Sequence, residues 1–490
     1  MFACLALLAT RGYYAISLVE PLQGQTRGAE YESLFPIWKE IQGLSLYTDL
    51  TEIPYTGTYY NWLYYISYAS VSELFLSLLS LGDAWIPTVT RITTLVGAIT
   101  GAALIYLSMI RLFPLQAGWL KVITASLSVS VFLGPLTGYF AIATTPDIWP
   151  LAAAVAAISL FIIHYEKSPL SAILAVCLLS YFAWAFKQNF LNIPATIGLF
   201  LLVRRDWKNA AILTVVLITA GILTLILGGP EYRSMLLFGE TQLSLTFEQL
   251  GINLFGFLVK TLPVLTLAGG FVVLSFSAPD FRRAFAEMIH HRPTMMVPFI
   301  GVMVSMIEAI PTGAIVAAAE NHFFHLAYFV AFSSLILLHL STMAAQPIIK
   351  IGLCAGFIGN TLAIASVFIG VQGSLSVREF HDLLTTQSRC LRGLSQSIYV
   401  DDPNLSLPWM VPANDHFVLE YSYEWDRAKG VEFEAGGVGG LIDKGYFEHI
   451  AILKSRGRQI DGSDMSLYPN MIRSCGRFNV YERSLPSANQ

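Results

Sequence analysis

Long apolar runs separated by short polar segments fill the first three quarters of the chain. Eleven of these runs have about the length that a helix needs to cross roughly 30 Å of hydrocarbon. They lie near 1–19, 88–110, 121–141, 147–164, 169–186, 189–203, 209–228, 257–277, 295–311, 322–342 and 347–371. A twelfth run, 61–81, carries Tyr, Ser and Glu73, so it suits either a spanning helix or an amphipathic helix on the membrane surface. The pattern predicts an all-α polytopic membrane protein.

The positions of Lys and Arg decide between the two placements of 61–81, because short cytoplasmic loops carry the excess of these residues. If 61–81 does not span, every basic cluster falls on one side of the membrane. These clusters contain Arg111, Lys121, Lys167, Arg204, Arg205, Lys208, Arg282, Arg283, Arg292 and Lys350. If 61–81 spans, the strongest cluster, R-R-D-W-K, moves to the opposite side. We therefore expect about eleven spanning helices, an external loop at 20–87, and juxtamembrane helices on the outer face.

The last part of the chain has the composition of an ordinary soluble domain. We expect a transmembrane domain at 1–372 and a small α/β domain at 373–490, on the outer face. Candidate strands lie at 397–400, 417–422, 449–453 and 478–481, between clusters of Gly, Pro and Asp. In a domain outside the cytosol, Cys390 and Cys475 are candidates for a disulfide. The run G-G-V-G-G at 436–440 lacks the context of a phosphate loop, and we interpret it as a turn.

Composition supports these expectations and excludes one class of partner. The chain is 55% hydrophobic and only 13% charged, and its mean hydropathy is +0.60, well outside the range of soluble proteins. A net charge of −4, without a long basic run, does not favour nucleic acid. The first run has no basic leader and no cleavage motif, so 1–19 is expected to be a retained anchor in the plasma (inner) membrane, surrounded by membrane lipids.

The stretch from Arg27 to Tyr65 combines acids and aromatics in a way that a lipid-facing helix would not. Glu30 and Glu32 follow the first apolar run directly. A carboxylate held at the membrane edge is positioned to take a proton from an incoming hydroxyl; a solvated loop acid is the alternative interpretation. The Tyr-rich segment that includes Tyr55, Tyr59 and Tyr60 suits either an interfacial aromatic belt or stacking on sugar rings.

The same stretch has a characteristic order of features: an acidic residue, a short helix ending at Gly43, L-Y-T-D, Pro-Tyr and a Tyr-rich helix. This order resembles the first outer loop of the GT-C glycosyltransferases, in the branch related to protein O-mannosyltransferases and lipid A aminoarabinose transferase. The resemblance covers roughly residues 1–370 and implies a fold with many helices and juxtamembrane helices in the first loop. It agrees with the topology that the charges alone favour.

The resemblance also implies roles for individual acids. The family usually has an Asp-Glu pair thirteen to fourteen positions before the glycine, and here the pair reads Ala29-Glu30. Glu30 is therefore the candidate catalytic base, with Glu32 as the reserve. A second family position, the Asp at the start of a helix in T-T-P-D-I-W-P-L, falls on Asp147, as a further catalytic residue. The alternative for Asp147 is simple helix capping.

A third motif, A-F-K-Q-N-F, resembles the family's Lys-Gln or Lys-Gly at an external helix junction. It makes Lys187 the candidate ligand of the donor phosphate, with Gln188 beside it, and Arg27 and Arg233 as further phosphate ligands. The alternative for Lys187 is a side chain that only snorkels to the surface.

The fourth motif, A-E-N-H-F-F-H-L, resembles the family's Asn-Tyr-Phe at an outer helix start, with His322 where Tyr is commoner, and the resemblance implies that Asn321 and His322 are substrate ligands. Glu308, a charge near the outer end of its helix, is a further candidate for lining the same cavity, or it only pairs with a neighbour. His322 and His325 have a spacing that allows metal binding, but no further ligand accompanies them, so a divalent metal is possible but not indicated and no cofactor is expected.

Together these features imply an inverting glycosyltransferase, a hexosyl- or pentosyltransferase, that moves a sugar from a polyprenyl-phosphate-linked donor to a glycan, lipid or protein hydroxyl on the outer face. A transporter or flippase of lipid-linked sugars is the main alternative, although the chain shows no duplicated halves. A non-catalytic protein that presents the C-terminal domain is a third interpretation.

Overall fold

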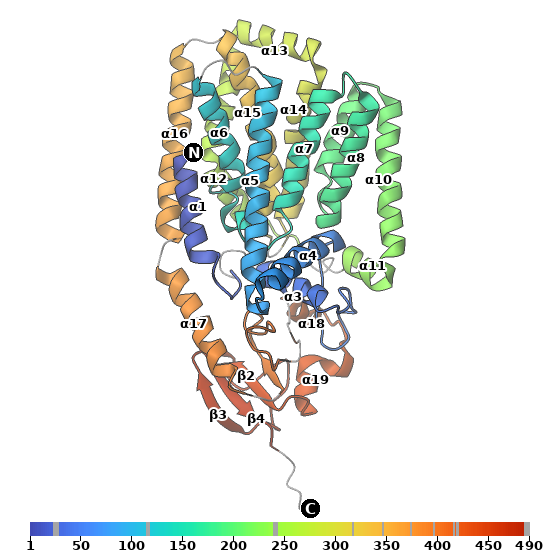
Figure 1. The fold of residues 1–490 in the computed structure, drawn as a ribbon, viewed down its shortest axis with the longest axis vertical. Coiled ribbons are helices and arrows are strands. Elements are labelled where there is room, and N and C mark those ends of the chain that lie inside the picture. The colour runs from blue at the N-terminus through green and yellow to red at the C-terminus, as the bar shows by residue number, and fades with distance from the viewer. Residues whose placement is uncertain are drawn as a thin grey trace, which may run out of the picture.

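The computed structural model describes residues 1–22, 29–113, 118–238, 244–315, 318–344, 347–372, 375–394, 397–414, 417 and 421–484. Most of them form a long bundle of helices with a small α/β domain at one end (Figure 1). All eleven predicted apolar runs form helices. Their bounds are α1 (Phe2–Ala15), α5 (Ile86–Leu112), α6 (Gly118–Leu133), α7 (Ile148–His164), α8 (Pro169–Phe186), α9 (Asn192–Val203), α10 (Trp207–Leu227), α12 (Phe247–Ser277), α14 (Val297–Gly313), α15 (Phe324–Ala344) and α16 (Pro347–Gln372).

Length and hydropathy identify the spanning candidates among the described residues. Seven helices are long and apolar enough to cross a membrane, and three shorter apolar helices, α6, α7 and α9, accompany them in the bundle. Helix α1 has 14 residues and runs beside α16 from half the height of the bundle towards the C-terminal domain (Figure 1). The expected fold class, an all-α polytopic membrane protein with a small C-terminal domain, is confirmed.

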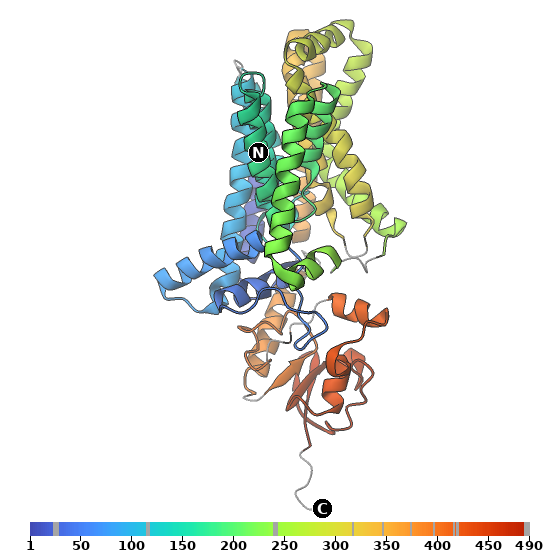
Figure 2. The ribbon, with the colours of Figure 1, turned by 90° about the vertical axis from the view of Figure 1, so that its right-hand side faces the viewer.

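Two helices of the first loop lie across the end of the bundle that faces the C-terminal domain. They are α3 (Ala29–Ile41) and α4 (Trp62–Leu79), which pack against each other, and α4 projects sideways from the bundle axis (Figure 2). Helix α4 is not among the spanning candidates. Its polar positions, including the buried Ser72, are used in packing at the bundle end rather than in crossing it. This placement matches the peripheral helix that the charge pattern predicts.

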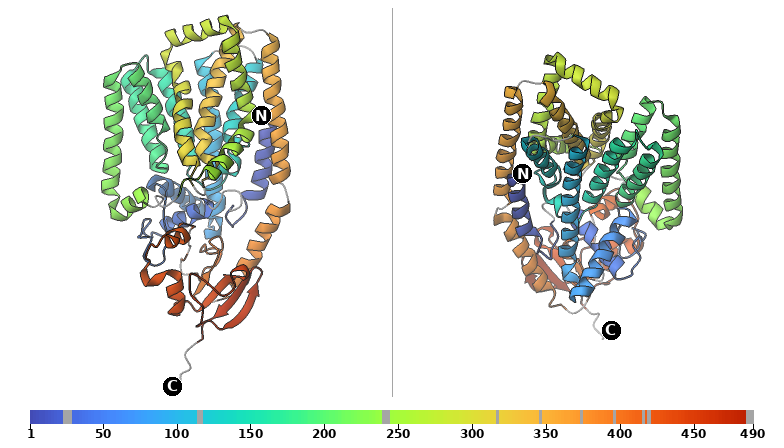
Figure 3. Two further views of the ribbon diagram at one scale, coloured as in Figure 1. Left: turned by 180° about the vertical axis from the view of Figure 1, so that it is seen from behind. Right: turned by 45° about the horizontal axis from the view of Figure 1, so that its top comes forward.

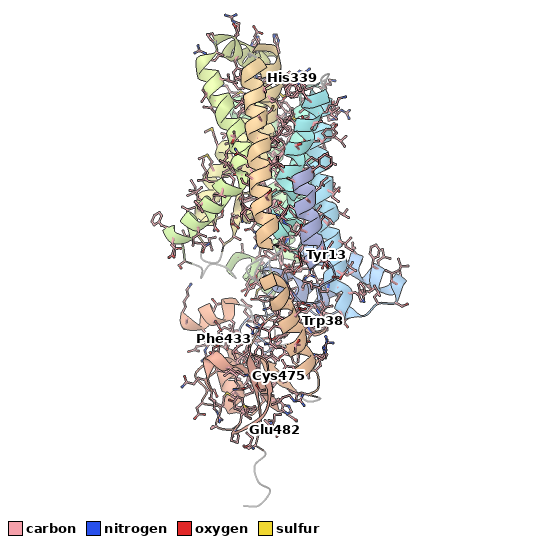
Figure 4. All side chains as sticks on the ribbon, turned by 90° about the vertical axis from the view of Figure 1, so that its left-hand side faces the viewer. Tyr13, Trp38, His339, Phe433, Cys475 and Glu482 are labelled. Carbon is pink, nitrogen blue, oxygen red and sulfur yellow. A yellow bond between two sulfur atoms is a disulfide. The ribbon has the colours of Figure 1, made fainter. Side chains whose placement is uncertain are left out.

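The opposite end of the bundle is closed by α13 (Pro279–His291), which lies across it (Figure 3). This helix carries Arg282 and Arg283 on its exposed side and buries Phe281. Figure 4 locates three side chains along the same axis: His339 lies near this end, Trp38 near the other, and Cys475 in the C-terminal domain.

The C-terminal domain begins with α17 (Leu375–Leu391) and is built on a four-stranded sheet of order β1-β2-β4-β3. Strands β1 (Ile398–Val400) and β2 (His449–Leu453) are parallel, and β4 (Phe478–Glu482) is antiparallel to both β2 and β3 (Asn470–Cys475). The two candidate cysteines, Cys390 of α17 and Cys475 of β3, form a disulfide.

Three of the four predicted strands are confirmed, as β1, β2 and β4. The fourth, 417–422, is wrong where it can be judged, because α18 (Tyr421–Ala428) begins there, while 418–420 lie outside the described residues. Strand β3 was missed because most of its side chains are exposed and its sequence lacks an alternating pattern. The expected turn at 436–440 is also wrong beyond Gly436, since α19 (Gly437–Asp443) starts at its second glycine.

Candidate active site

Three bundle connections meet at one buried ion pair. Lys187 Nζ lies 2.8 Å from Asp147 Oδ1, and the two side chains are 8% and 4% exposed. Asp147 precedes α7 and Lys187 follows α8, so these antiparallel neighbours bring the two ends together. The Asn321 amide, in the short helix Glu320–Phe323, donates a hydrogen bond of 3.1 Å to the same carboxylate oxygen. Residues far apart in sequence thus form one polar centre inside an apolar bundle end.

The loop between α3 and α4 covers this centre. The ring centroid of Tyr60 lies 5.5 Å from Lys187 Nζ, within the range of a cation–π contact. Gln188 Nε2 donates to the Tyr59 carbonyl at 2.8 Å, and the hydroxyl of Tyr47 donates to the Tyr60 carbonyl at 2.8 Å. The predicted substrate residues Tyr59, Tyr60 and Gln188 therefore lie together beside Lys187.

Further ionisable side chains surround the pair. Glu308 of α14 interacts electrostatically with Lys187, and His322 and His325 interact with both members of the pair. The imidazole of His325 also contacts the ring of Phe190, with centroids 4.4 Å apart. Within the described residues no three His, Cys, Asp or Glu side chains gather closely enough to hold a metal ion.

Several buried polar atoms near this pair have no hydrogen-bond partner among the described residues. They are Thr145 Oγ1, Gln188 Oε1, Asn189 Oδ1, Asn192 Oδ1, Asn321 Oδ1 and His325 Nε2. Each unmet group of this kind costs about 1–3 kcal/mol in a folded protein, so folded chains keep few of them. Those that adjoin Asp147 and Lys187 in the chain, or belong to Asn321, which is bonded to Asp147, leave hydrogen-bonding atoms available to a polar ligand.

Glu30 is held in a different way. Its carboxylate is fully buried and accepts hydrogen bonds from Arg91 Nε at 2.9 Å and Arg91 Nη2 at 2.8 Å. The backbone N–H groups of Leu22 and Thr144 donate to it at 2.6 and 2.9 Å. Burial acts to raise the pKa of Glu30, but the charge and hydrogen bonds of Arg91, with the two backbone donors, lower the pKa overall. This carboxylate is therefore ionised, enclosed and fully hydrogen-bonded.

Thr144 connects the two carboxylates. Its N–H binds Glu30 and it lies three residues before Asp147, so the Glu30–Arg91 pair fixes the segment that presents Asp147 to Lys187. Both predicted groups, Glu30 and Lys187, thus lie at the same end of the bundle. The role of Glu30 as a base stays a prediction.

The contacts described for the remaining predicted residues are with other parts of the chain, and one of these residues lies outside the described chain. Glu32 is half-buried and accepts a hydrogen bond of 3.5 Å from Tyr31. Arg233 lies on α11 (Gly229–Phe238) and donates to the Leu225 carbonyl at 3.4 Å. Tyr55 packs into the aromatic core of the C-terminal domain, where its hydroxyl donates to the Glu434 carbonyl at 2.6 Å. Arg27 lies outside the described residues.

Arg91 is the residue that sequence reasoning missed. It binds Glu30 and also donates to the carbonyls of Ala15 and Glu20, both at 2.7 Å, so it joins the ends of α1 and α3 to α5. A usable signal was present, because an arginine inside the apolar run T-V-T-R-I-T-T is a candidate for a buried, paired charge.

The apolar bundle, the flat helices of the first loop and the polar centre beneath them define a polytopic membrane protein with the GT-C fold. Comparison with solved structures supports this class. The chain resembles ArnT from Cupriavidus metallidurans bound to undecaprenyl phosphate, with a TM-score of 0.57, 11% identity, and 97% of each chain covered. It resembles the apo state of the same protein with a TM-score of 0.56 and 12% identity, again over 97% of each chain. No protein-family model and no curated protein sequence matched the chain.

Proposed function

We propose that this protein is an inverting glycosyltransferase that moves a sugar from a polyprenyl-phosphate carrier to an acceptor hydroxyl at the outer face of the plasma (inner) membrane. The observation that carries the proposal is the buried Lys187–Asp147 pair, with unpartnered polar atoms beside it. The pair lies at the bundle end that faces the C-terminal domain, in a GT-C fold. The solved ArnT structure that the chain resembles holds undecaprenyl phosphate. A lipid-linked donor requires both an apolar route for its tail and a cation for its phosphate.

Lys187 is the proposed phosphate ligand. Its ammonium now binds the Asp147 carboxylate, and an arriving donor phosphate would compete for it. The same ammonium then balances the negative charge that develops on the leaving phosphate, which is where electrostatic stabilisation most lowers a barrier. The unpartnered amide oxygens of Gln188, Asn189 and Asn321 suit the hydroxyl groups of the sugar.

Of the predicted acids, Asp147 is best placed to act as the base. Glu30 has every carboxylate contact satisfied by Arg91 and the backbone, whereas Asp147 shares the centre with the unpartnered atoms. In the proposed step the acceptor oxygen bonds to the anomeric carbon, the bond from that carbon to the phosphate oxygen breaks, and the acceptor proton goes to Asp147. Polyprenyl phosphate leaves, and the configuration at the anomeric carbon inverts. Glu30 is then a positioning residue for segment 144–147.

The proposal is tested by incubating purified protein in lipid nanodiscs with radiolabelled polyprenyl-phosphate sugars and candidate acceptors. Lys187→Ala should raise the KM for donor and lower kcat, and Asp147→Asn should lower kcat by about 10²-fold or more. Glu30→Gln should act mainly through stability. Lys208→Ala, an exposed lysine at the other end of the bundle, is the matched control.

Two outcomes would contradict the proposal. Movement of the lipid-linked sugar across a vesicle bilayer without covalent transfer would favour the flippase alternative. Transfer at full rate in Lys187→Ala would remove Lys187 from the site. Because an ammonium supplies the countercharge in the proposed step, EDTA should leave the rate unchanged.

A further inference from the structure

A cavity of about 590 Å³ opens in the C-terminal domain, outside the helix bundle. Its walls are formed by the end of β1 and the turn after it, by α18, by the start of α19 and by the segment 456–462. Nothing in the glycosyl transfer proposed above uses it. Its volume lies in the range of cavities that enclose small polar ligands.

The polar side chains on the walls hold one another in place. Asp461 accepts hydrogen bonds from the Tyr423 hydroxyl at 2.6 Å and from the Gly439 N–H at 3.1 Å, and it pairs with Arg427. Arg427 also donates to the backbone carbonyl of Asp461 at 2.7 Å. Side chains fixed in this way lose little further conformational entropy when a ligand binds, which favours recognition.

Four carboxylates line the cavity, those of Asp401, Asp402, Glu424 and Asp461, and three arginines pair with them, Arg427, Arg456 and Arg477. Arg456 is shared by two acids, with Nε 3.4 Å from Asp401 and Nη2 2.7 Å from Glu424. The Asp401 side chain is only 6% exposed. Burial raises the pKa of the Asp401 carboxyl to about 6, more than the attraction of Arg456 lowers it. A ligand that brings hydroxyl or ammonium donors would relieve this imbalance, and an anionic ligand would worsen it.

The same loop contacts both this cavity and the candidate active site. Tyr423, on the cavity wall, stacks on Tyr55 with ring centroids 5.7 Å apart. Tyr55 belongs to the loop between α3 and α4, which is also bound to the C-terminal domain by a hydrogen bond of 2.8 Å from Glu434 N to the Thr51 carbonyl. Five residues after Tyr55, Tyr60 lies over Lys187. The loop between α3 and α4 therefore contacts both a residue of the cavity wall and Lys187 of the candidate active site.

We propose that this cavity binds a saccharide segment of the acceptor, uncharged or cationic, and that it discriminates against anionic saccharides. Sugar hydroxyls both donate and accept hydrogen bonds, as the fixed carboxylates and guanidinium groups of the cavity wall require. The assignment of this saccharide to an acceptor rests on the proposed glycosyl transfer; its binding to the cavity does not.

The test is calorimetric titration of the full-length protein in nanodiscs with three trisaccharides of equal length. These are tri-N-acetylglucosamine, which is neutral, triglucosamine, which is cationic, and trigalacturonate, which is anionic. The first two should bind, and trigalacturonate should bind at least tenfold more weakly. Asp401→Asn should reduce the preference for triglucosamine over tri-N-acetylglucosamine by about fivefold. Ala428→Trp, at an exposed position on the cavity wall, should abolish binding without disturbing the domain core.

Glu432→Gln, an exposed acid of the same domain that does not line the cavity, is the matched control and should change nothing. Failure of both the neutral and the cationic probe to bind would overturn the proposal, as would equal binding of trigalacturonate or full binding in Ala428→Trp. Lys187→Ala separates the proposed glycosyl transfer from the proposed saccharide site, because this variant should lose sugar transfer and keep saccharide binding in the cavity. If the wild-type protein binds the saccharide but transfers no sugar, the proposed enzyme function is contradicted and the proposed binding site is not.

Discussion

Glu30 and Lys187 both carry buried charges, but their surroundings differ. Glu30 is closed in by Arg91 and two backbone donors, so its charge serves the architecture of the bundle end. Lys187 has one carboxylate partner and lies among unpartnered oxygens, so its charge remains able to serve a ligand. The two residues differ in whether the polar atoms around the charge already have hydrogen-bond partners. This difference separates a positioning residue from a binding residue.

Arg91→Met should destabilise the protein by about 3–5 kcal/mol, because it leaves the Glu30 carboxylate buried without its countercharge. The double variant Glu30→Gln with Arg91→Met should recover part of that loss. Thermal unfolding in detergent, followed by circular dichroism, measures both. Equal destabilisation of the single and double variants would show that Glu30 does not depend on Arg91.

The raised pKa of Asp401 should make the stability of the fold depend on pH with the opposite sign to that of a paired carboxylate. Burial, opposed by Arg456, raises its pKa to about 6, above the value of about 3.9 in an unfolded chain. The folded state therefore retains the Asp401 proton to higher pH, and the resulting stabilisation is present below about pH 4 and lost as pH rises through about 6. Asp401→Asn should raise the Tm at pH 7.5 and not at pH 4.

The control for this effect is Glu432→Gln on the same domain, whose side chain is exposed. Its melting curves should follow those of the wild type at both pH values. A Tm for Asp401→Asn that is lower than wild type at pH 7.5 would contradict the assignment of an electrostatic penalty to Asp401.

At the scale of elements, glycines set how closely the membrane helices approach. A Cβ added to Gly301 of α14 would lie 2.3 Å from the ring of Phe329 on α15. Close approach through small residues is a common means by which membrane helices associate, since lipid gives little hydrophobic drive. Helix α14 also carries Glu308 and Ser305 towards the polar centre, so its spacing from α15 matters for the site as well as for stability.

Gly301→Ala should cost about 1–3 kcal/mol by overpacking. Gly221→Ala, in the middle of α10 with nothing within 4 Å of the added methyl, should be neutral or slightly stabilising. Detergent melting temperatures of the two single variants provide the comparison. The packing argument fails if both variants melt at the wild-type temperature.

The Cys390–Cys475 disulfide joins α17, the helix that leads from α16 into the C-terminal domain, to the edge strand β3. Cys475→Ser should lower the stability of this domain by about 2–4 kcal/mol, because the bridge closes a loop of 85 residues in the unfolded chain. Limited proteolysis should cleave the variant faster than the wild type. Unchanged protection in Cys475→Ser would mean that packing alone holds α17 on the sheet.

On the scale of the whole molecule, the two ends differ in character. One end carries the C-terminal domain, α3, α4 and the candidate site; the other carries α13 with its arginines (Figures 1 and 3). Short cytoplasmic segments hold the excess of Lys and Arg. The α13 end is therefore expected to face the cytoplasm, and the C-terminal domain the outer side.

Single cysteines test this orientation. In a Cys354→Ala background, Lys429→Cys in the C-terminal domain should react with a membrane-impermeant maleimide in intact cells. Glu287→Cys on α13 should react only after permeabilisation. Both positions are exposed in the structure, and the free cysteines Cys4 and Cys177 are buried. The reverse labelling pattern would invert the topology and place the candidate site in the cytoplasm.

The membrane bundle could be predicted from the amino-acid sequence alone, because burial of backbone in lipid forces long apolar segments into helices, and such segments are visible without any tertiary information. Charge asymmetry was also enough to place 61–81 flat against the bundle end. Three strands of the soluble domain followed from local pattern. Strand β3 did not, because an exposed edge strand obeys no hydrophobic periodicity.

The contacts of the individual polar residues, in contrast, became visible only in three dimensions. Sequence motifs were enough to select Asp147, Lys187, Gln188 and Asn321 as candidates. These residues lie at one centre because the helix ends that carry them meet in space. The enclosure of Glu30 by Arg91 and the packing of Tyr55 into the C-terminal domain depend on contacts between segments distant along the chain. Apolar patterns are local and periodic, whereas the pairing of a buried charge is not.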